Sequence, residues 1–254
     1  MLYSHEEKKE LFKRLAEQES LGQAYLFFGE SKIGKFLFAK HLAFFLEYGE
    51  FNILKKPLVD TIIVETSSET LGLDDLDEVN KFISQRPFKS SKRLIIIRDA
   101  EKLTEHAASS LLKQVEESSD HTSFIFIAND PQTILPPLVS RLMKVYFSKL
   151  SSQEIDKILV SDFDLNKSEA KKVSMQSFGC IGEALDIIED KKEEIEEEES
   201  IYDYISEKIK SLYIKDKFKN SKVISRLLKR EEKIKQFNLN PKVQKKAIEF
   251  ELKK

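Results

Sequence analysis

The sequence predicts an α/β fold in which helices cover both faces of a parallel five-stranded sheet. Over residues 1–150, short apolar runs alternate with segments of helical periodicity. The apolar runs carry hydrophobic residues at consecutive positions, as strands do when both faces of a sheet are covered. Strands separated by helices are joined by crossover connections, which place neighbouring strands parallel to one another.

Five segments have the composition of buried strands, being short and rich in β-branched or aromatic residues. They are Ala24–Phe28, Asp60–Glu65, Leu94–Ile97, Phe124–Ala128 and Lys144–Phe147. Gly29 follows the first of them directly, which indicates a turn where that strand ends.

Helices are predicted between the strands from apolar residues that recur every three or four positions. Their ranges are Ser4–Glu19, Phe36–Tyr48, Leu73–Gln85 and Thr104–Glu117. In the first helix we expect Leu11, Phe12 and Leu15 to share one face. In the third helix, Leu76, Val79, Phe82 and Ile83 recur at helical spacing.

From Ser151 onward the strand pattern stops. Three short helices are expected, at Ser152–Val160, Lys167–Gln176 and Ile181–Ile188. The acidic stretch Glu189–Glu199 is interpreted as a solvated helix or a linker. The lysine-rich remainder, Ile201–Lys254, is expected to be helical with a break near Asn238–Pro241. We therefore divide the chain into a core domain (1–150), a small helical domain (151–190) and an acidic connection with a helical C-terminal domain (191–254).

Composition excludes several classes of protein. The formal net charge of −2 gives no overall attraction to nucleic acid or membranes. A single cysteine, Cys180, excludes an internal disulfide and a multi-cysteine zinc site. The sequence lacks an apolar run of roughly 20 residues and begins with polar residues, so we expect a soluble, cytoplasmic protein without a signal peptide or membrane contact.

Gly29–Lys35 has the spacing of a phosphate-binding loop, Gly-x4-Gly-Lys, between a predicted strand and a predicted helix. Gly29 and Gly34 allow the backbone to turn its N–H groups toward phosphate oxygens, and Lys35 is placed to meet the β and γ phosphates. The next position normally offers a hydroxyl to Mg²⁺, but Phe36 cannot bind a hard cation. The motif predicts a phosphate loop with a lost metal position; the alternative is an ordinary glycine-rich turn.

A second set of metal-holding residues is expected where the strand Leu94–Ile97 ends, because acids there orient Mg²⁺ and the attacking water. Arg98 stands in the first of these positions and would repel the cation. Asp99 could take the metal role if it were displaced by one residue, although a strand reverses side-chain direction at each step. Alternatively, Asp99 and Glu101 are first-turn acids favoured by a helix dipole. We predict no metal site.

Several blocks resemble the clamp-loader subunits of bacterial DNA polymerase III, which are AAA+ proteins. The most specific is Ala107–Glu117, AASSLLKQVEE, which is similar to the family's helix AANALLKTLEEP. Other similar blocks are His5–Glu7, Gln23–Phe27, the phosphate loop, Leu71–Asp74, Phe126–Pro131, Leu135–Arg141 and Asn238–Lys242. The resemblance implies an AAA+ core, a small helical lid and a helical collar that is shorter here than in the family. The family's four-cysteine zinc module is missing, and Leu46–Pro57 is a short connection instead.

The resemblance assigns roles to residues on two sides of the fold. Ser140 and Arg141 match the family's Ser-Arg-Cys motif, which implies an arginine finger that reaches the γ-phosphate held by a neighbouring subunit. The alternative for Arg141 is a surface arginine in a cap or a salt bridge. Asn129 lies at the sensor 1 position, and Gly182 stands where active subunits carry a nucleotide-contacting arginine.

Phe36, Arg98 and Gly182 replace the family's Mg²⁺-binding hydroxyl, first acid and nucleotide-contacting arginine, while Ser140 and Arg141 are retained. This combination resembles the delta prime type of subunit. This implies a stator-like chain that assembles with the gamma/tau ATPase and delta subunits of the polymerase III holoenzyme. It would supply Arg141 in trans for loading the sliding clamp on primer–template DNA. No activity alone and no required cofactor are expected, and binding of ATP or ADP is left open.

One alternative is a gamma/tau-like ATPase with displaced metal ligands. A small P-loop kinase is another, but it would not explain the Ala107–Glu117 block.

Overall fold

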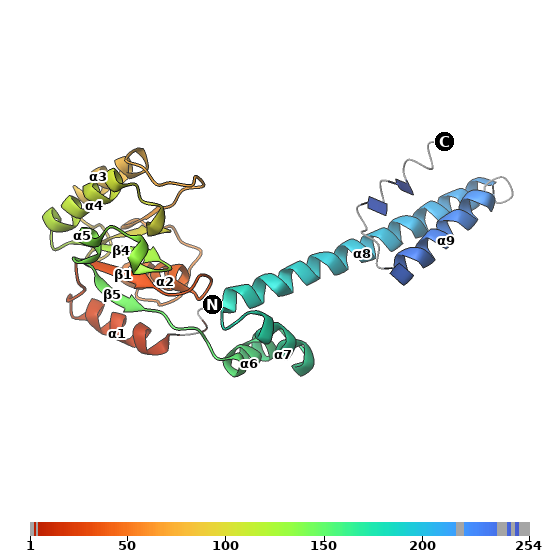
Figure 1. Cartoon of the computed structure of the whole chain (residues 1–254), viewed down its shortest axis with the longest axis horizontal. Coiled ribbons are helices and arrows are strands. Elements are labelled where there is room, and N and C mark those ends of the chain that lie inside the picture. Colours follow the sequence, from red (N-terminus) through yellow and green to blue (C-terminus); the bar gives the residue numbers. More distant parts are fainter. Residues whose placement is uncertain (1–2, 4, 217–220, 238–242, 245–246, 249–254) are drawn as a thin grey trace. The chain divides into compact units, whose positions relative to one another are not determined.

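The computed structural model describes residues 3, 5–216, 221–237, 243–244 and 247–248. The chain divides into two compact units, Met1–Ala184 and Leu185–Lys254 (Figure 1). The predicted boundaries after residues 150 and 190 stay a prediction. None of the helices in the described ranges has the length and apolarity needed to cross a bilayer.

The first unit contains the predicted five-stranded sheet, and every pairing is parallel. The strands are β1 (Ala24–Phe28), β2 (Thr61–Val64), β3 (Arg93–Ile97), β4 (Thr122–Ala128) and β5 (Met143–Tyr146). Their order in the sheet is β2-β3-β4-β1-β5. Because β3, β4 and β1 are consecutive neighbours and run parallel, the segments that leave these strands lie at the same end of the sheet.

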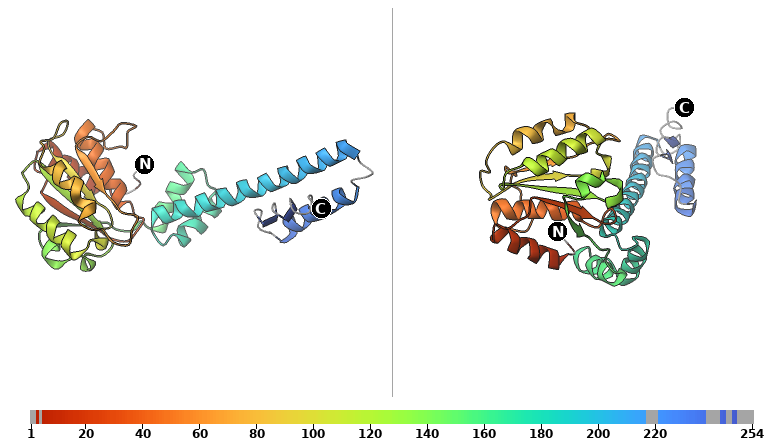
Figure 2. Two further views of the ribbon diagram at one scale, coloured as in Figure 1. Left: turned by 90° about the horizontal axis from the view of Figure 1, so that it is seen from above. Right: turned by 60° about the vertical axis from the view of Figure 1, so that its left-hand side comes forward.

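Helices cover both faces of this sheet (Figures 1 and 2). On one face lie α1 (Glu6–Glu17) and α2 (Lys35–Tyr48), which pack Phe12, Phe38 and Leu42 against Phe27 and other strand residues. On the other lie α3 (Asp77–Ile83), α4 (Glu105–Glu117) and α5 (Pro136–Val139), whose apolar side chains form a second core with Leu26, Ile95 and Phe126. The predicted fold class is confirmed.

Two details of the predicted helices differ. Leu11 was expected on the buried face of α1 but is 45% exposed, because the stripe that faces the sheet is centred on Phe12, and Leu11 is turned about 100° from it. The third helix begins as a 3₁₀ turn, η1 (Asp74–Leu76), before α3. Leu76 and Val79 are buried, and Phe82 and Ile83 pack against the same core as predicted.

A helical lid follows β5. It comprises α6 (Ser152–Asp162), α7 (Lys167–Gln176) and the start of α8 (Ile181–Asp216). Ser151 and Glu154 form a capping box at the start of α6, since each side chain accepts a hydrogen bond from the other residue's backbone N–H. The Leu150 N–H donates to the Gly179 carbonyl at 3.0 Å, which ties the entry of the lid to its last helix.

Helix α8 is much longer than predicted. A short helix ending at Ile188 was expected, followed by an acidic stretch that forms either a solvated helix or a linker. The backbone stays helical through this stretch to Asp216, so the helix is the alternative that is found. After Gly182 this segment contains no glycine or proline, and its many Glu, Lys and Ile residues favour continued helix. In the second unit, α9 (Ser221–Phe237) contributes Leu227 and Ile234 to a small core with Ile205 of α8. The predicted break near Asn238–Pro241 lies outside the described residues.

Candidate functional site

The phosphate loop lies between β1 and α2, as the Gly-x4-Gly-Lys spacing predicts. Gly29 has φ +138°, and a Cβ there would come within 2.3 Å of the Phe147 carbonyl oxygen, so only glycine fits. Gly34 adopts φ +98° immediately before α2. The strand, loop and helix therefore have the context of a phosphate loop, rather than of an unrelated turn.

Lys35 is folded back onto its own loop. Its ammonium donates to the carbonyl oxygens of Gly29 and Glu30, both at 2.6 Å, and to Asn129 Oδ1 at 3.1 Å. Because an ammonium has three N–H donors, these three acceptors use all of them. Lys35 is 6% exposed, and burial lowers the pKa of its ammonium, against the opposing effect of the nearby Glu101, Glu30 and Asp99 carboxylates.

Asn129 connects this lysine to an acid. It follows β4, and its amide Nδ2 donates to Glu101 Oε1 at 2.8 Å. Glu101 lies in the 3₁₀ turn η2 (Ala100–Lys102), after β3. Its second oxygen, Oε2, is buried without a hydrogen-bond partner among the described residues. Lys35, Asn129 and Glu101 therefore form one hydrogen-bonded chain at the edge where β1, β3 and β4 end.

The two residues at the metal-holding positions contact each other. The Arg98 guanidinium lies over the Phe36 ring, with Cζ 4.9 Å from the ring centroid. Arg98 Nη1 also pairs with Glu65 Oε2 at 3.0 Å, just beyond β2. The phenyl ring of Phe36 thus replaces the usual hydroxyl, and the guanidinium of Arg98 replaces the usual carboxylate.

Asp99 adopts the left-handed conformation, with φ +53°, and its Oδ2 lies 3.9 Å from Lys102 Nζ. The predicted interpretation as an acid at a helix start fits its position, since it is the residue that precedes η2.

Mg²⁺ does not fit this set of residues. A magnesium site needs several oxygen ligands in octahedral geometry, whereas Phe36 has none to offer and Arg98 is positively charged. Within the described ranges there is also no group of three or more His, Cys, Asp or Glu residues that could hold a metal ion. To contact a phosphate, moreover, the Lys35 ammonium would have to leave acceptors that already satisfy it.

The lid is docked on the same loop. The Gly182 N–H donates to the Lys32 carbonyl oxygen at 2.9 Å, and a Cβ at Gly182 would lie 2.9 Å from that oxygen. Glu183 Oε2 pairs with Lys32 Nζ at 2.7 Å, and Lys149 Nζ pairs with Glu30 Oε1 at 3.3 Å. Glycine at this position, where active subunits carry an arginine, therefore lets the backbone of α8 contact the phosphate loop directly. Sequence reasoning identified Gly182 but not these ion pairs.

Arg141 and Ser140 lie at the end of α5. Arg141 Nε donates to Glu116 Oε1 on α4 at 2.9 Å, and its Nη1 donates to Ser140 Oγ at 3.0 Å. The Arg141 side chain remains 50% exposed. These contacts join Arg141 to α4 and α5 rather than to the chain of Lys35, Asn129 and Glu101. Glu116 belongs to the Ala107–Glu117 block, but nothing in the sequence alone pairs it with Arg141.

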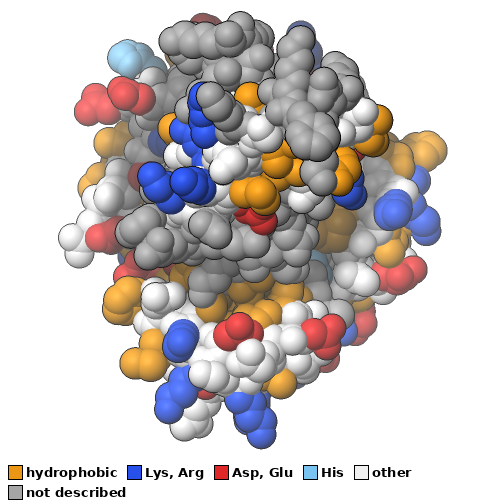
Figure 3. All heavy atoms as spheres, turned by 90° about the vertical axis from the view of Figure 1, so that its right-hand side faces the viewer, with side chains coloured by type: hydrophobic (Ala, Val, Ile, Leu, Met, Phe, Trp, Pro, Cys, Tyr) orange, Lys and Arg blue, Asp and Glu red, His pale blue; other side chains and the backbone are white. Residues whose placement is uncertain are grey.

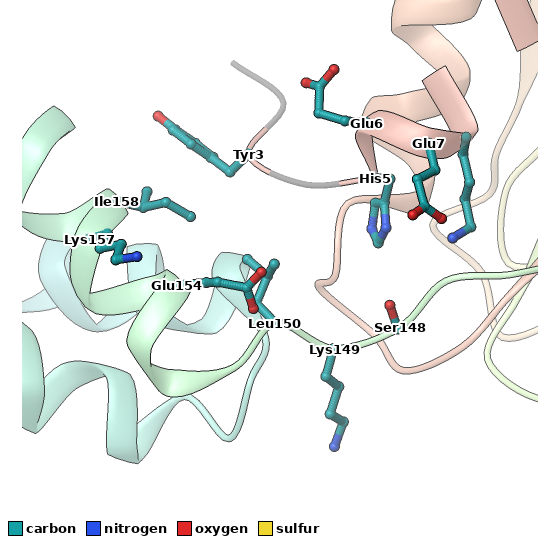
Figure 4. A pocket seen from close by; sticks show the side chains of 11 residues that line it. Tyr3, His5, Glu6, Glu7, Ser148, Lys149, Leu150, Glu154, Lys157 and Ile158 are labelled. Atoms are coloured by element: carbon teal, nitrogen blue, oxygen red, sulfur yellow. The ribbon is translucent and has the colours of Figure 1, made fainter. Parts of the chain in front are cut away.

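A separate cavity of about 610 Å³ lies between the segment that precedes α1 and helix α6. Figure 4 shows His5 and Glu7 on one side and Glu154 and Ile158 of α6 on the other, with the Tyr3 side chain pointing toward α6. The His5 ring lies 3.2 Å from the Ile33 carbonyl oxygen of the phosphate loop, and burial lowers the pKa of His5. The residues that line this cavity carry both signs of charge, so the cavity shows no preference for one class of ligand.

Figure 3 shows one face of the molecule, where described basic, acidic and hydrophobic side chains are interspersed.

Solved structures with the same fold include two proteins from Thermotoga maritima. A gamma-subunit-related protein of DNA polymerase III from Thermotoga maritima matches with TM-score 0.50 and 20% identity, over 87% of this chain and 76% of that one. A RuvB variant from the same organism matches with TM-score 0.53 and 12% identity, over 94% of this chain and 72% of that one. Together with the phosphate loop after β1 and the helical lid, these likenesses show that the chain has the AAA+ fold of P-loop proteins.

Residues 4–151 match the family described as DNA polymerase III, delta subunit, and the chain belongs to this family of bacterial clamp-loader AAA+ subunits. Among curated relatives, the gamma/tau subunit of Mycoplasma pneumoniae is 28% identical over 154 residues, which cover 56% of this chain and 22% of that protein. The delta' subunit of Bacillus subtilis is 30% identical over 156 residues, covering 57% and 47% respectively. This chain thus aligns with less than half the length of either relative.

Proposed function

We propose that this chain is a non-hydrolysing, delta-prime-type subunit that supplies Arg141 in trans to an ATPase neighbour during clamp loading. The observation that carries the proposal is the contrast between two sites on one domain. At the phosphate loop, Phe36 and Arg98 contact each other where a metal would bind. At the end of α5, Arg141 is half exposed.

The chemistry of each site supports this division of roles. Phosphoryl transfer needs a metal ion that bridges the phosphates, and a cation beside a phenyl ring disfavours one. A planar guanidinium suits the opposite task, because it can bind a phosphoryl group held by another chain through two parallel hydrogen bonds. The proposed partners are therefore gamma/tau-type ATPase and delta subunits, with the sliding clamp and primer–template DNA reached through the complex.

The test is to reconstitute the loader with the Arg141→Ala variant of this chain and to measure DNA-stimulated ATPase and clamp loading. Arginine fingers are worth roughly 10³- to 10⁵-fold in rate. We therefore expect ATP hydrolysis at the interface that Arg141 serves to be lost, and clamp loading to fall with it. Arg14→Ala is the matched control, since Arg14 is an exposed arginine on α1. Unchanged ATPase and loading with Arg141→Ala would reject the trans role.

A gamma/tau-like ATPase is the second candidate, favoured by relatives with that name and by Glu101 Oε2, which has no hydrogen-bond partner in the described part of the chain. It predicts steady ATP hydrolysis by the isolated chain, lost on Lys35→Ala. Absence of hydrolysis at any Mg²⁺ concentration tested would leave the delta-prime-type function as the better supported one.

A further inference from the structure

We propose that Glu116 is a positioning residue that aims the Arg141 guanidinium at a phosphate on a neighbouring subunit, an inference that rests on the proposed function. Glu116 Oε1 accepts a hydrogen bond from Arg141 Nε at 2.9 Å. The two residues come from different helices, since Glu116 lies in the last turn of α4 and Arg141 follows α5.

Ser140 completes the support for the guanidinium. Its hydroxyl donates to the Pro137 carbonyl oxygen at 2.7 Å and accepts from Arg141 Nη1 at 3.0 Å. A hydroxyl has one donor and two acceptor positions, so both bonds are made at once. The hydroxyl direction is thus set by the backbone of α5, and the Arg141 side chain is restrained at two of its three nitrogens.

The remaining N–H groups are available for a ligand. A guanidinium carries five N–H donors, and Glu116 and Ser140 use two of them within the described structure, which leaves three. Nη2 makes neither of these bonds. Because Glu116 contacts Nε alone, a phosphoryl group could be bound through the terminal nitrogens while the contact with Glu116 is kept.

Both partners are held by the same buried core. Val115, next to Glu116, is 3% exposed, and Leu138 of α5 is 1% exposed. Both belong to the cluster that covers one face of the sheet. The separation of α4 and α5 is therefore set by packing, whereas an exposed ion pair by itself contributes little to stability. The expected effect of the ion pair between Glu116 and Arg141 is to reduce the number of rotamers that the long arginine side chain samples.

The test compares Glu116→Ala and Glu116→Gln in the reconstituted loader, with Glu117→Ala as the matched control on the same helix. A misplacement of about 1 Å can cost up to roughly 10²-fold in rate. We expect Glu116→Ala to lower the maximal ATPase rate of the Arg141-dependent interface by roughly tenfold. The KM for ATP and the thermal midpoint of the free chain should not change. Glu116→Gln should retain much of the rate, because its amide oxygen can accept from Nε.

A direct readout is the Arg141 Nε–Hε signal in NMR spectra of the free chain. We expect slow hydrogen exchange in the wild type, and faster exchange in Glu116→Ala but not in Glu117→Ala. If Arg141→Ala silences the interface while Glu116→Ala leaves its rate unchanged or raises it, the positioning role is rejected and the proposed function stands. If Arg141→Ala itself has no effect, the proposed function fails first.

Discussion

The guanidinium of Arg98 lies over the ring of Phe36, with Cζ 4.9 Å from the ring centroid. One residue comes from the end of β3 and the other from the first turn of α2, and both stand where metal ligands are expected in a P-loop ATPase. The two departures are therefore coupled physically, because each side chain provides part of the other's environment. Restoring one metal ligand would leave the other side chain in the way.

We expect this coupling to be measurable in folding. An exposed or half-exposed cation–π contact is worth about 0.5–1 kcal/mol, and Arg98 keeps a 46% exposed side chain. A double-mutant cycle with Phe36→Leu and Arg98→Gln, followed by urea unfolding, should give an interaction free energy in that range. The corresponding cycle with Phe36→Leu and Lys32→Gln is the control and should give a value near zero. Additive effects of Phe36→Leu and Arg98→Gln would contradict the contact.

The Lys35 side chain is predicted to stabilise its own loop. It is nearly fully buried and donates to the Gly29 and Glu30 carbonyl oxygens and to Asn129. A buried acceptor left without a donor costs about 1–3 kcal/mol. We therefore expect Lys35→Met to lower the free energy of unfolding by about that amount, measured by urea denaturation.

The same variant separates a structural lysine from a catalytic one. Under conditions where the variant is folded, a loader containing Lys35→Met should keep its ATPase rate if this chain does not hydrolyse ATP. Lys40→Met, five residues further along α2, is the control for loss of a lysine. A large fall in ATPase rate with Lys35→Met but not with Lys40→Met would favour the hydrolysing alternative.

Much of the fold followed from the sequence because apolar runs and helical periodicity directly reflect burial on a covered sheet. All five strands lie within two residues of their predicted bounds. The end of α8 was missed because charge alone does not stop a helix; glycine or proline usually does, and neither occurs between Glu183 and Asp216.

The site was predictable only where spacing along the chain determines geometry. The phosphate loop is a local motif, so the positions of Gly29, Gly34 and Lys35 followed from their order. The contact of Arg98 with Phe36 and that of Glu116 with Arg141 join elements that are distant in sequence. Such pairs depend on how strands and helices are packed, and a single sequence does not encode that in a readable pattern.

Asp60 gives a prediction for the pH dependence of stability. Burial tends to raise its pKa, but the backbone N–H groups of Phe88, Ser90 and Lys89, with the Ser90 hydroxyl, outweigh it, so the pKa of Asp60 lies below its ordinary value. The folded state therefore binds this proton less tightly than the unfolded chain. The stabilisation is fully present above the unfolded pKa of about 3.9 and is lost as the pH falls through the lower folded pKa.

We expect Asp60→Asn to lower the free energy of unfolding by about 2 kcal/mol near pH 7, since hydrogen bonds to a charged acceptor become bonds to a neutral one. The difference between wild type and Asp60→Asn should shrink as the pH falls below about 4, because the protonated carboxyl no longer offers its charge. Urea denaturation between acidic and neutral pH measures this difference. Asp120→Asn, at an exposed aspartate, is the control for the loss of a carboxylate. If the Asp60→Asn difference instead stays the same down to the acid limit of folding, the three N–H bonds to the loop before β3 do not depend on the charge of Asp60.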